Sequence, residues 1–319
     1  MSRVTPHVGV AASLPPSGER LSAAEVSLVC ESAACERVRL LCARGCRLSD
    51  ADFGRVCASL AASHSLAQLN LSLGVVGGVD RTLRLAHALG ANRSLHTLLL
   101  HGNPLSDSGL LTLSPALSAH PALVSLDLGD CKLGDAALRL VCGMLPPDGA
   151  KSGLKELTLS ANPDVSFKGW SGLAIAVAHS SQLRVLNLDY NELGDQIAGM
   201  LAVAVASSRT LEVLDLEGTG LTNQSAQVFL DMVENFPTSL RLLVLSENQV
   251  SPALQRMIAD LLTEGEEEDD RRGPPLGLDP AFSSKPLPMR DKKQTPSDSD
   301  PQSVMLTSLN DSLLAETDM

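Results

Sequence analysis

Hydrophobic residues recur in one fixed pattern between Val38 and about Thr263. The pattern runs leucine, two residues, leucine, one residue, leucine, two residues, a small or polar residue, one further residue and an aliphatic. Its eight copies start 28 to 31 residues apart, at Val38, Leu66, Leu95, Leu123, Leu154, Leu183, Leu211 and Leu240. In each copy the alternating leucines indicate a short strand, and the apolar residues that follow have the spacing of a helix. The chain therefore predicts eight similar strand–helix units in a row.

A period of this size is typical of leucine-rich repeats, which stack into a curved solenoid. We predict an α/β solenoid, a horseshoe of about eight repeats of 28–31 residues, with parallel strands on the concave face and helices on the convex face. In the fourth copy, Leu123, Leu126 and Leu128 should enter the core. A cap-forming residue precedes a carboxylate at the expected helix starts, where the positive helix end favours an acid. These pairs are Ser49-Asp50, Ser106-Asp107, Gly134-Asp135 and Gly194-Asp195.

Four segments follow from this pattern. Residues 1–20 contain prolines and glycines without apolar periodicity, and we expect them to be disordered. Residues 21–37 should form a helix that caps the open end of the array, since Ser22 and Glu25 have the spacing of a capping box. Residues 38–263 are the array. Residues 264–319 are acidic and then rich in proline and serine, which predicts a disordered tail.

The tail contains one further feature, a group of aliphatic residues near its end. Val304, Met305, Leu309, Leu313 and Leu314 fall mostly on one face of a short terminal helix, if one forms. Such a helix could enter a groove on a partner or fold back onto the array. The alternative is a free chain end with incidental aliphatics.

The ninth position of the repeat is Asn or Cys in six copies: Asn103, Asn162, Asn191, Asn248, Cys46 and Cys131. A buried amide there can pair the backbone groups of the turn, so we interpret these residues as structural. Gly74 and Thr219 depart from this rule, and residues 147–153, PDGAKSG, should bulge on the helix-to-strand side.

The seven cysteines are odd in number and form no CxxC pair, which favours reduced thiols in the cytosol.

The formal net charge is -12, and from Glu264 onward 13 Asp or Glu stand against six Lys or Arg. Phosphate backbones repel an acidic chain, so we expect no nucleic-acid partner. No stretch approaches the ~18–20 apolar residues of a membrane span. The first 20 residues lack the apolar run of a signal peptide. We therefore expect a cytoplasmic protein without membrane insertion.

Repeats of 28 to 29 residues with helical second halves resemble the ribonuclease-inhibitor class of leucine-rich repeat proteins. That class is intracellular, and it includes the sensor arrays of NOD-like receptors and the Ran GTPase-activating protein. The resemblance implies a protein-binding array, with regulation of a small GTPase as the alternative. The chain has no GxxxxGK[ST] nucleotide loop. Nor does any loop show an evident catalytic Arg or Asn, so the GTPase alternative rests on fold analogy.

In this class the third, fifth and seventh repeat positions face the concave side, because alternate strand residues point in opposite directions. Acidic residues occupy these positions in the second half of the array, and one tyrosine lies beside them. We predict that a basic segment of a protein partner binds a surface made of Asp127, Glu156, Asp189, Tyr190, Asp215 and Glu217. The alternative is an ordinary solvated strand face. The scarcity of aromatic residues, which usually dominate interface energies, suggests modest affinity.

Ser72, His101 and Asp127 fall on successive expected strands and could be mistaken for a nucleophilic triad. They would lie on an open face without a pocket or an oxyanion donor, so we expect no enzyme. The scattered Cys and His lack the paired spacing of a zinc site, so we expect neither a metal nor a cofactor. The sequence thus favours a non-catalytic, monomeric scaffold.

Overall fold

The computed structural model describes residues 10–13, 26–27, 30–31, 38–145 and 153–271. The chain divides into two units, Met1–Gly273 and Pro274–Met319, and every described residue belongs to the first. The aliphatic group between Val304 and Leu314 lies outside the described residues, as does all of the PDGAKSG insertion except Gly153.

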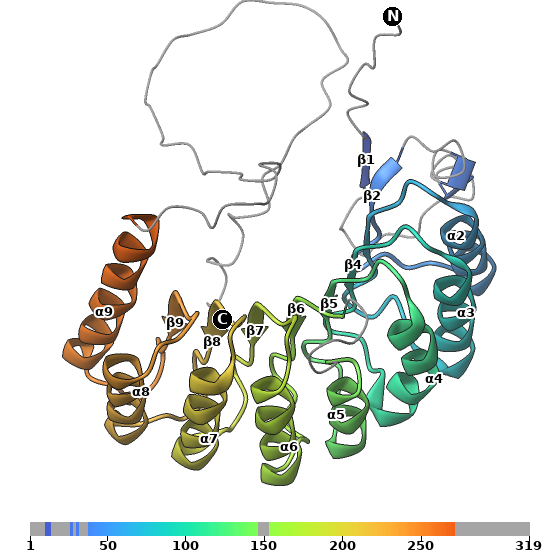
Figure 1. Cartoon of the computed structure of the whole chain (residues 1–319). Helices are drawn as coiled ribbons and strands as arrows, with labels where there is room; N and C mark the ends of the chain where they lie inside the picture. Colours follow the sequence, from blue (N-terminus) through green and yellow to red (C-terminus); the bar gives the residue numbers. More distant parts are fainter. Residues whose placement is uncertain (1–9, 14–25, 28–29, 32–37, 146–152, 272–319) are drawn as a thin grey trace, which may run out of the picture. The chain divides into compact units, whose positions relative to one another are not determined.

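Strands and helices alternate along the described array (Figure 1). The strands are β1 (Val10–Ser13), β2 (Val38–Cys42), β3 (Gln68–Asn70), β4 (Thr97–Leu99), β5 (Ser125–Asp127), β6 (Glu156–Thr158), β7 (Val185–Asn187), β8 (Val213–Asp215) and β9 (Leu242–Val244). The helices are α2 (Asp50–Ala62), α3 (Gly78–Ala91), α4 (Ser106–Ala119), α5 (Asp135–Cys142), α6 (Phe167–Ala178), α7 (Gly194–Ser207), α8 (Asn223–Asn235) and α9 (Pro252–Arg271). All strands form one parallel sheet in sequence order. The predicted solenoid is confirmed, with the strands inside and the helices outside.

The pattern leucines form one continuous core. From β2 to β8 the fourth-position residue of each repeat is a leucine with at most 1% of its surface exposed. Burying each such side chain stabilises the fold by about 1.5–3 kcal/mol. Their counterpart in β9, Leu243, is only half-buried, because no further described repeat covers it. The core therefore weakens toward the C-terminal end of the sheet.

Both ends of the array differ from the sequence-based boundaries. Val10–Ser13 lies in the segment expected to be disordered, yet it forms β1 and pairs with β2, whose outer backbone groups would otherwise lack partners. In the expected capping helix, the described residues 26–27 and 30–31 are helical, and Val26 is buried. Helix α9 continues past Thr263 to Arg271, because the residues added are mostly good helix formers.

Every repeat turns sharply after its strand, at the eighth position. All eight residues there have a left-handed backbone with φ between 46° and 68°: Gly45, Leu73, Gly102, Asp130, Ala161, Tyr190, Gly218 and Glu247. Glycine adopts this conformation freely, whereas other residues are strained in it. The turn belongs to the fold, so the strain at Tyr190 is not by itself a sign of function.

The ninth-position amides have the predicted structural role. Asn162 is 1% exposed; its Nδ2 donates to the carbonyls of Leu128 and Leu159, and its Oδ1 accepts from the N–H groups of Cys131 and Leu133. Asn103, Asn191 and Asn248 link their own turn to the preceding repeat in the same way. Thr219, which departs from the pattern, bonds the Leu216 carbonyl through its hydroxyl. The residue at the ninth repeat position therefore connects adjacent repeats.

The carboxylates at the helix starts lie in the first turn of their own helix and also hydrogen-bond the next repeat. Asp107 accepts from the N–H groups of Gly134 and Ala137, at 2.7 and 3.1 Å. Asp135 accepts from the Ser166 N–H, and Asp195 from the Thr222 N–H. The expectation that each acid serves its own helix dipole is incomplete, because stacking brings the next helix start within hydrogen-bonding distance. Capping is thus another link between repeats.

Candidate partner-binding surface

Sheet register places five of the six predicted site residues in three parallel rows on the concave face. The third-position row runs from Ser125 through Glu156 to Val185 and Val213. The fifth-position row holds Asp127 and Asp215, separated by Thr158 and Asn187. The seventh-position row holds Asp189 and Glu217, whose carbonyls accept from the preceding repeat. Glu156 is exposed and separate in the third row, whereas the other acids form two adjacent rows.

The fifth-position acids have a local structural task. The Oδ1 atom of Asp127 accepts from the Gly129 N–H at 2.9 Å, and that of Asp215 accepts from the Glu217 N–H at 3.0 Å. Asn187 makes the equivalent bond with an amide oxygen, at 2.8 Å. Both aspartates are half-buried. An amide could hold the turn equally well, which means that their charge is not needed for this bond.

Negative charge accumulates around Asp189. Burial raises the pKa of Asp127 and of Asp215, and the neighbouring Asp189 carboxylate raises each pKa further. A backbone hydrogen bond opposes the shift at each site, and His101 and Arg44 oppose it at Asp127. The Oδ1 atom of Asp189 is buried without a hydrogen-bond partner among the described residues. The Asp189 carboxylate can therefore accept a further hydrogen bond from a cationic side chain.

Tyr190 is held against the C-terminal side of this cluster. Its hydroxyl donates to Glu217 Oε1 at 2.7 Å and lies 3.3 Å from Glu247 Oε2. The bond to Glu217 is the largest reason why the pKa of Tyr190 is raised. Hydrogen bonds from Ser246 and Tyr190 lower the pKa of Glu217. The ring is 50% exposed, and its edge lies over Gly218, where a Cβ atom would be 2.9 Å from Tyr190 Cδ1.

Two members of this arrangement, Gly218 and Glu247, were missed by the sequence prediction. Both stand at the eighth repeat position, which the concave rows leave out, and Tyr190 stands there as well. The repeat spacing alone could have aligned the three residues. Their contact depends on the left-handed turn, which directs the Tyr190 ring across the next repeat.

The triad-like residues do not form a catalytic arrangement. Ser72 is 2% exposed, and its N–H donates to Asn70 Oδ1. No hydrogen bond joins Ser72 to His101 among the described residues. His101 instead lies beside Gly129, where a Cβ atom would be 2.5 Å from its Nδ1, and its positive charge lowers the pKa of Asp127. These contacts give no route for activating the serine.

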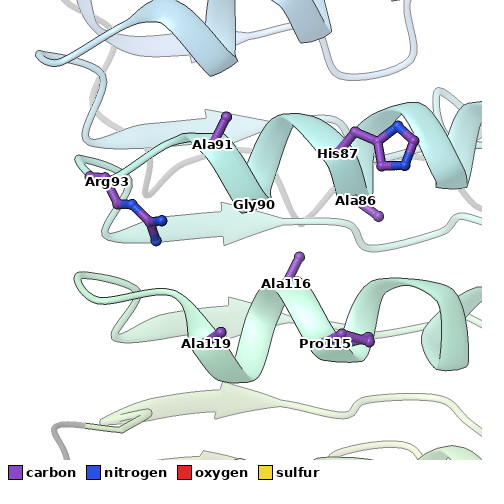
Figure 2. A pocket seen from close by; sticks show the side chains of 8 residues that line it. All are labelled: Ala86, His87, Gly90, Ala91, Arg93, Pro115, Ala116 and Ala119. Carbon is purple, nitrogen blue, oxygen red and sulfur yellow. The ribbon is translucent and has the colours of Figure 1, made fainter.

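A second surface feature is a groove between α3 and α4 on the helical side (Figure 2). Its lining is mostly small and apolar, and it includes two cationic or titratable side chains, His87 and Arg93. The other lining residues are Ala86, Gly90, Ala91, Pro115, Ala116 and Ala119. Neither a carboxylate nor a hydroxyl side chain is among these eight residues. The groove is therefore a mostly apolar surface with one imidazole and one guanidinium.

Within the described residues, no group of three or more His, Cys, Asp or Glu side chains is arranged to hold a metal ion. No helix in the same part of the chain combines the length and the apolar character needed to cross a membrane. The six described cysteines, Cys30, Cys42, Cys46, Cys57, Cys131 and Cys142, are free thiols.

Comparison with known proteins identifies the family. A leucine-rich repeat family model matches residues 120–142 and 179–202. The chain is 63% identical over 315 residues to leucine-rich repeat-containing protein 73 of Rattus norvegicus, covering 96% of this chain and 99% of that protein. The chain belongs to the leucine-rich repeat-containing protein 73 family.

This chain also matches more distant proteins. This chain is 30% identical over 157 residues to the ribonuclease inhibitor of Sus scrofa, covering 49% of this chain and 34% of that protein. The crystal structure of the yeast Rad7 and Elc1 complex matches with a TM-score of 0.53 and 17% identity, covering 74% of this chain and 57% of that chain. The structural match shows a shared solenoid fold.

Proposed function

We propose that this chain is a non-catalytic adaptor whose concave face, from β5 to β8, binds a basic segment of a protein partner. Leucine-rich repeat proteins generally mediate protein–protein interactions, and the repeat model and the relatives above support that class for this chain. The observation that carries the finer proposal is the half-buried negative charge around Asp189. No ion pair joins Asp127, Asp189, Asp215 or Glu217 to a Lys or Arg among the described residues.

A lysine or arginine from a partner would satisfy this cluster. Hydrogen bonds between an ionised donor and a carboxylate are about twice as strong as neutral ones. Half-buried charges are also screened less by salt than exposed charges, so the attraction would persist at physiological ionic strength. Burial is the main cause of the raised pKa values of Asp127 and Asp215, and the same cation would relieve the repulsion from Asp189 that raises them further. Binding and relief of repulsion therefore act in the same direction.

Apolar contact area lies next to the charges. Val185 and Val213 occupy the third-position row, one row away from Asp215, and both are partly exposed. Tyr190 adds an exposed aromatic ring on the other side of the acids. Aromatic residues often contribute much of the binding energy of an interface. The surface suits a partner segment that carries aliphatic residues beside its basic ones.

The free thiols support a reducing compartment such as the cytoplasm, where we place this adaptor as a monomer.

The test is a fourfold neutralising variant, Asp127→Asn, Asp189→Asn, Asp215→Asn and Glu217→Gln, in the full chain. Amides are chosen because Asn187 shows that an amide oxygen can hold the fifth-position turn. Partners captured in cells by the unmodified chain are purified, and each affinity is measured by fluorescence anisotropy at low and high salt. We expect affinity to fall by at least tenfold and the salt dependence to flatten, because the charges that attract the partner are gone.

The matched control removes the same formal charge elsewhere. Glu192, Asp231, Glu234 and Asp260 are exposed and lie outside the concave rows, and their amide variants should leave affinity within about twofold. Equal loss in both variants would indicate a general charge effect. Unchanged affinity in the concave variant would exclude this face as the binding surface. Either of these results would overturn the proposal.

A further inference from the structure

The C-terminal edge of the sheet presents a regular set of backbone donors. In inner repeats the sixth-position N–H donates to the next fifth-position carbonyl, as Leu216 does to Val244 at 3.0 Å. The eighth-position N–H donates to the next seventh-position carbonyl, as Gly218 does to Ser246 at 3.0 Å. Leu245 and Glu247 occupy these two positions after β9. No described strand follows β9, so neither N–H has an acceptor among the described residues.

The same edge leaves two apolar side chains more exposed than their counterparts in inner repeats. Leu242 in the third-position row is 50% exposed, whereas its neighbours Val213 and Val185 are partly covered. Leu243 is half-buried, although its seven counterparts are at most 1% exposed. In α9, which contacts β9, Leu254 and Leu261 are also only partly buried. An uncovered strand edge beside exposed leucines is an attachment point for another strand.

The opposite end of the sheet shows that an extended segment can fill such an edge. Val10–Ser13 adds to β2 as a parallel strand, although it carries no copy of the leucine pattern. A short extended segment is therefore enough to extend this sheet. Parallel addition at β9 would continue the same ladder in the same direction.

The charges beside β9 favour a basic occupant. Glu247 is exposed, and Glu217 of the preceding repeat lies within reach of the same Tyr190 hydroxyl. Tyr190, at the eighth position, contacts Glu217, at the seventh position of the following repeat. The seventh residue of an added strand would lie beside Glu247 in the same way. A lysine or arginine there would form a charge-assisted hydrogen bond.

We propose that β9 is a strand-addition site for an extended basic segment of a partner protein. The segment lies parallel to β9 and its carbonyls accept from the Leu245 and Glu247 N–H groups. Its aliphatic residues cover Leu243 and Leu242, and a basic residue pairs with Glu247. Backbone hydrogen bonds supply affinity in this mode, and alternate side chains supply specificity. Glu247, which pairs with the segment, is not one of the four concave acids, so the site does not rest on the proposed function.

The experiment titrates a synthetic peptide into the full isotopically labelled chain. The peptide carries leucine at its first, fourth and sixth positions, lysine at its seventh and eighth, and serine or threonine elsewhere. Amide exchange measured by nuclear magnetic resonance should slow at least tenfold at Leu245 and Glu247 when the peptide is saturating, because both N–H groups then gain acceptors. Unchanged exchange at both amides with a bound peptide would overturn strand addition.

Two control peptides isolate the backbone and the register. N-methylation of the fifth residue removes the N–H that a parallel ladder directs to the Leu243 carbonyl, and should weaken binding at least tenfold. Moving each leucine one position onward turns the apolar side chains to the wrong face, with a similar loss. Equal affinity for all three peptides would show non-specific apolar contact and would overturn the proposal.

Protein variants separate this site from the concave surface. Glu247→Lys should weaken the lysine peptide at least fivefold by repulsion, and a peptide with glutamate at its seventh and eighth positions should regain that affinity. Asp127→Asn, in the concave cluster, should leave peptide affinity within about twofold, because Asp127 lies on β5, four strands away from β9. A loss with Asp127→Asn and none with Glu247→Lys would place the peptide on the concave face and refute the edge site.

Discussion

Two rows of polar residues cross the same sheet, and they differ in how much of their bonding capacity the fold uses. At the ninth position, Asn162 bonds backbone groups of two repeats with both its amide N–H groups and its oxygen. At the fifth position, Asp127 and Asp215 use one oxygen for a local turn. The amide has no capacity left for a partner, whereas each carboxylate keeps a charge. A polar side chain can serve a partner only if the fold leaves part of its charge or hydrogen-bonding capacity unused, so polarity alone does not mark a binding surface.

The largest loss of stability should come from the ninth-position row, where the amide of Asn162 has no unused hydrogen-bonding capacity. Asn162→Ala leaves several buried backbone groups without partners, each costing about 1–3 kcal/mol, so we expect a loss of about 3–5 kcal/mol in the free energy of unfolding. Asn187→Ala, in the half-buried fifth row, removes the bond to the Asp189 N–H and should cost about 1 kcal/mol. Urea unfolding of both variants gives the comparison. Equal losses would contradict the distinction between the two rows.

A middle-sized effect should come from the turn beneath Tyr190. Gly218→Ala places a Cβ atom 2.9 Å from the ring in a left-handed backbone (φ 60°), and we expect a loss of about 2 kcal/mol by thermal or urea unfolding. Gly194→Ala is the matched control, because Gly194 is also left-handed but no atom lies within 4 Å of its added Cβ. In a Tyr190→Ala background the two alanines should cost the same. A persistent difference would show that the ring is not the obstacle.

The repeat pattern predicted the fold well because its information is local and repeated. Leucines at fixed spacing define the strands, and the ninth-position slot predicts a buried amide, as Asn162 confirms. The ends were harder to predict, since β1 depends on an open edge of β2 and on no pattern of its own. Likewise α9 passes the predicted boundary at Thr263, because a charged run can remain helical.

The candidate surface was predictable only in part. The period places Asp127 and Asp215 in one concave row, but it does not show that both are half-buried or that each holds a turn. The contact of Tyr190 with Glu247 spans two repeats and requires the left-handed turn, which sequence spacing does not show. Burial and side-chain direction arise from stacking, so they became visible only in the folded array.

The smallest effect is a difference in the pH dependence of stability. The pKa of Asp215 is raised in the folded chain from an ordinary 3.8, so ionised Asp215 destabilises the fold, and its penalty grows as pH rises from 3.8 through the folded pKa. Asp215→Asn should raise stability above that window by about 0.5 kcal/mol and remove its negative slope. At Asp195 burial raises the pKa, but hydrogen bonds from Ser225 and Thr222 outweigh it, so the net shift is downward.

Asp195 therefore provides the control with the opposite sign. Ionised Asp195 stabilises the fold above its unfolded pKa, and that contribution is lost as pH falls through the depressed folded value. Asp195→Asn should lower stability at neutral pH and remove a positive slope. Urea unfolding of both variants across the acidic range measures the two slopes. Slopes of the same sign would mean that the concave carboxylates are held as firmly as the capping ones, leaving no unsatisfied charge for a partner.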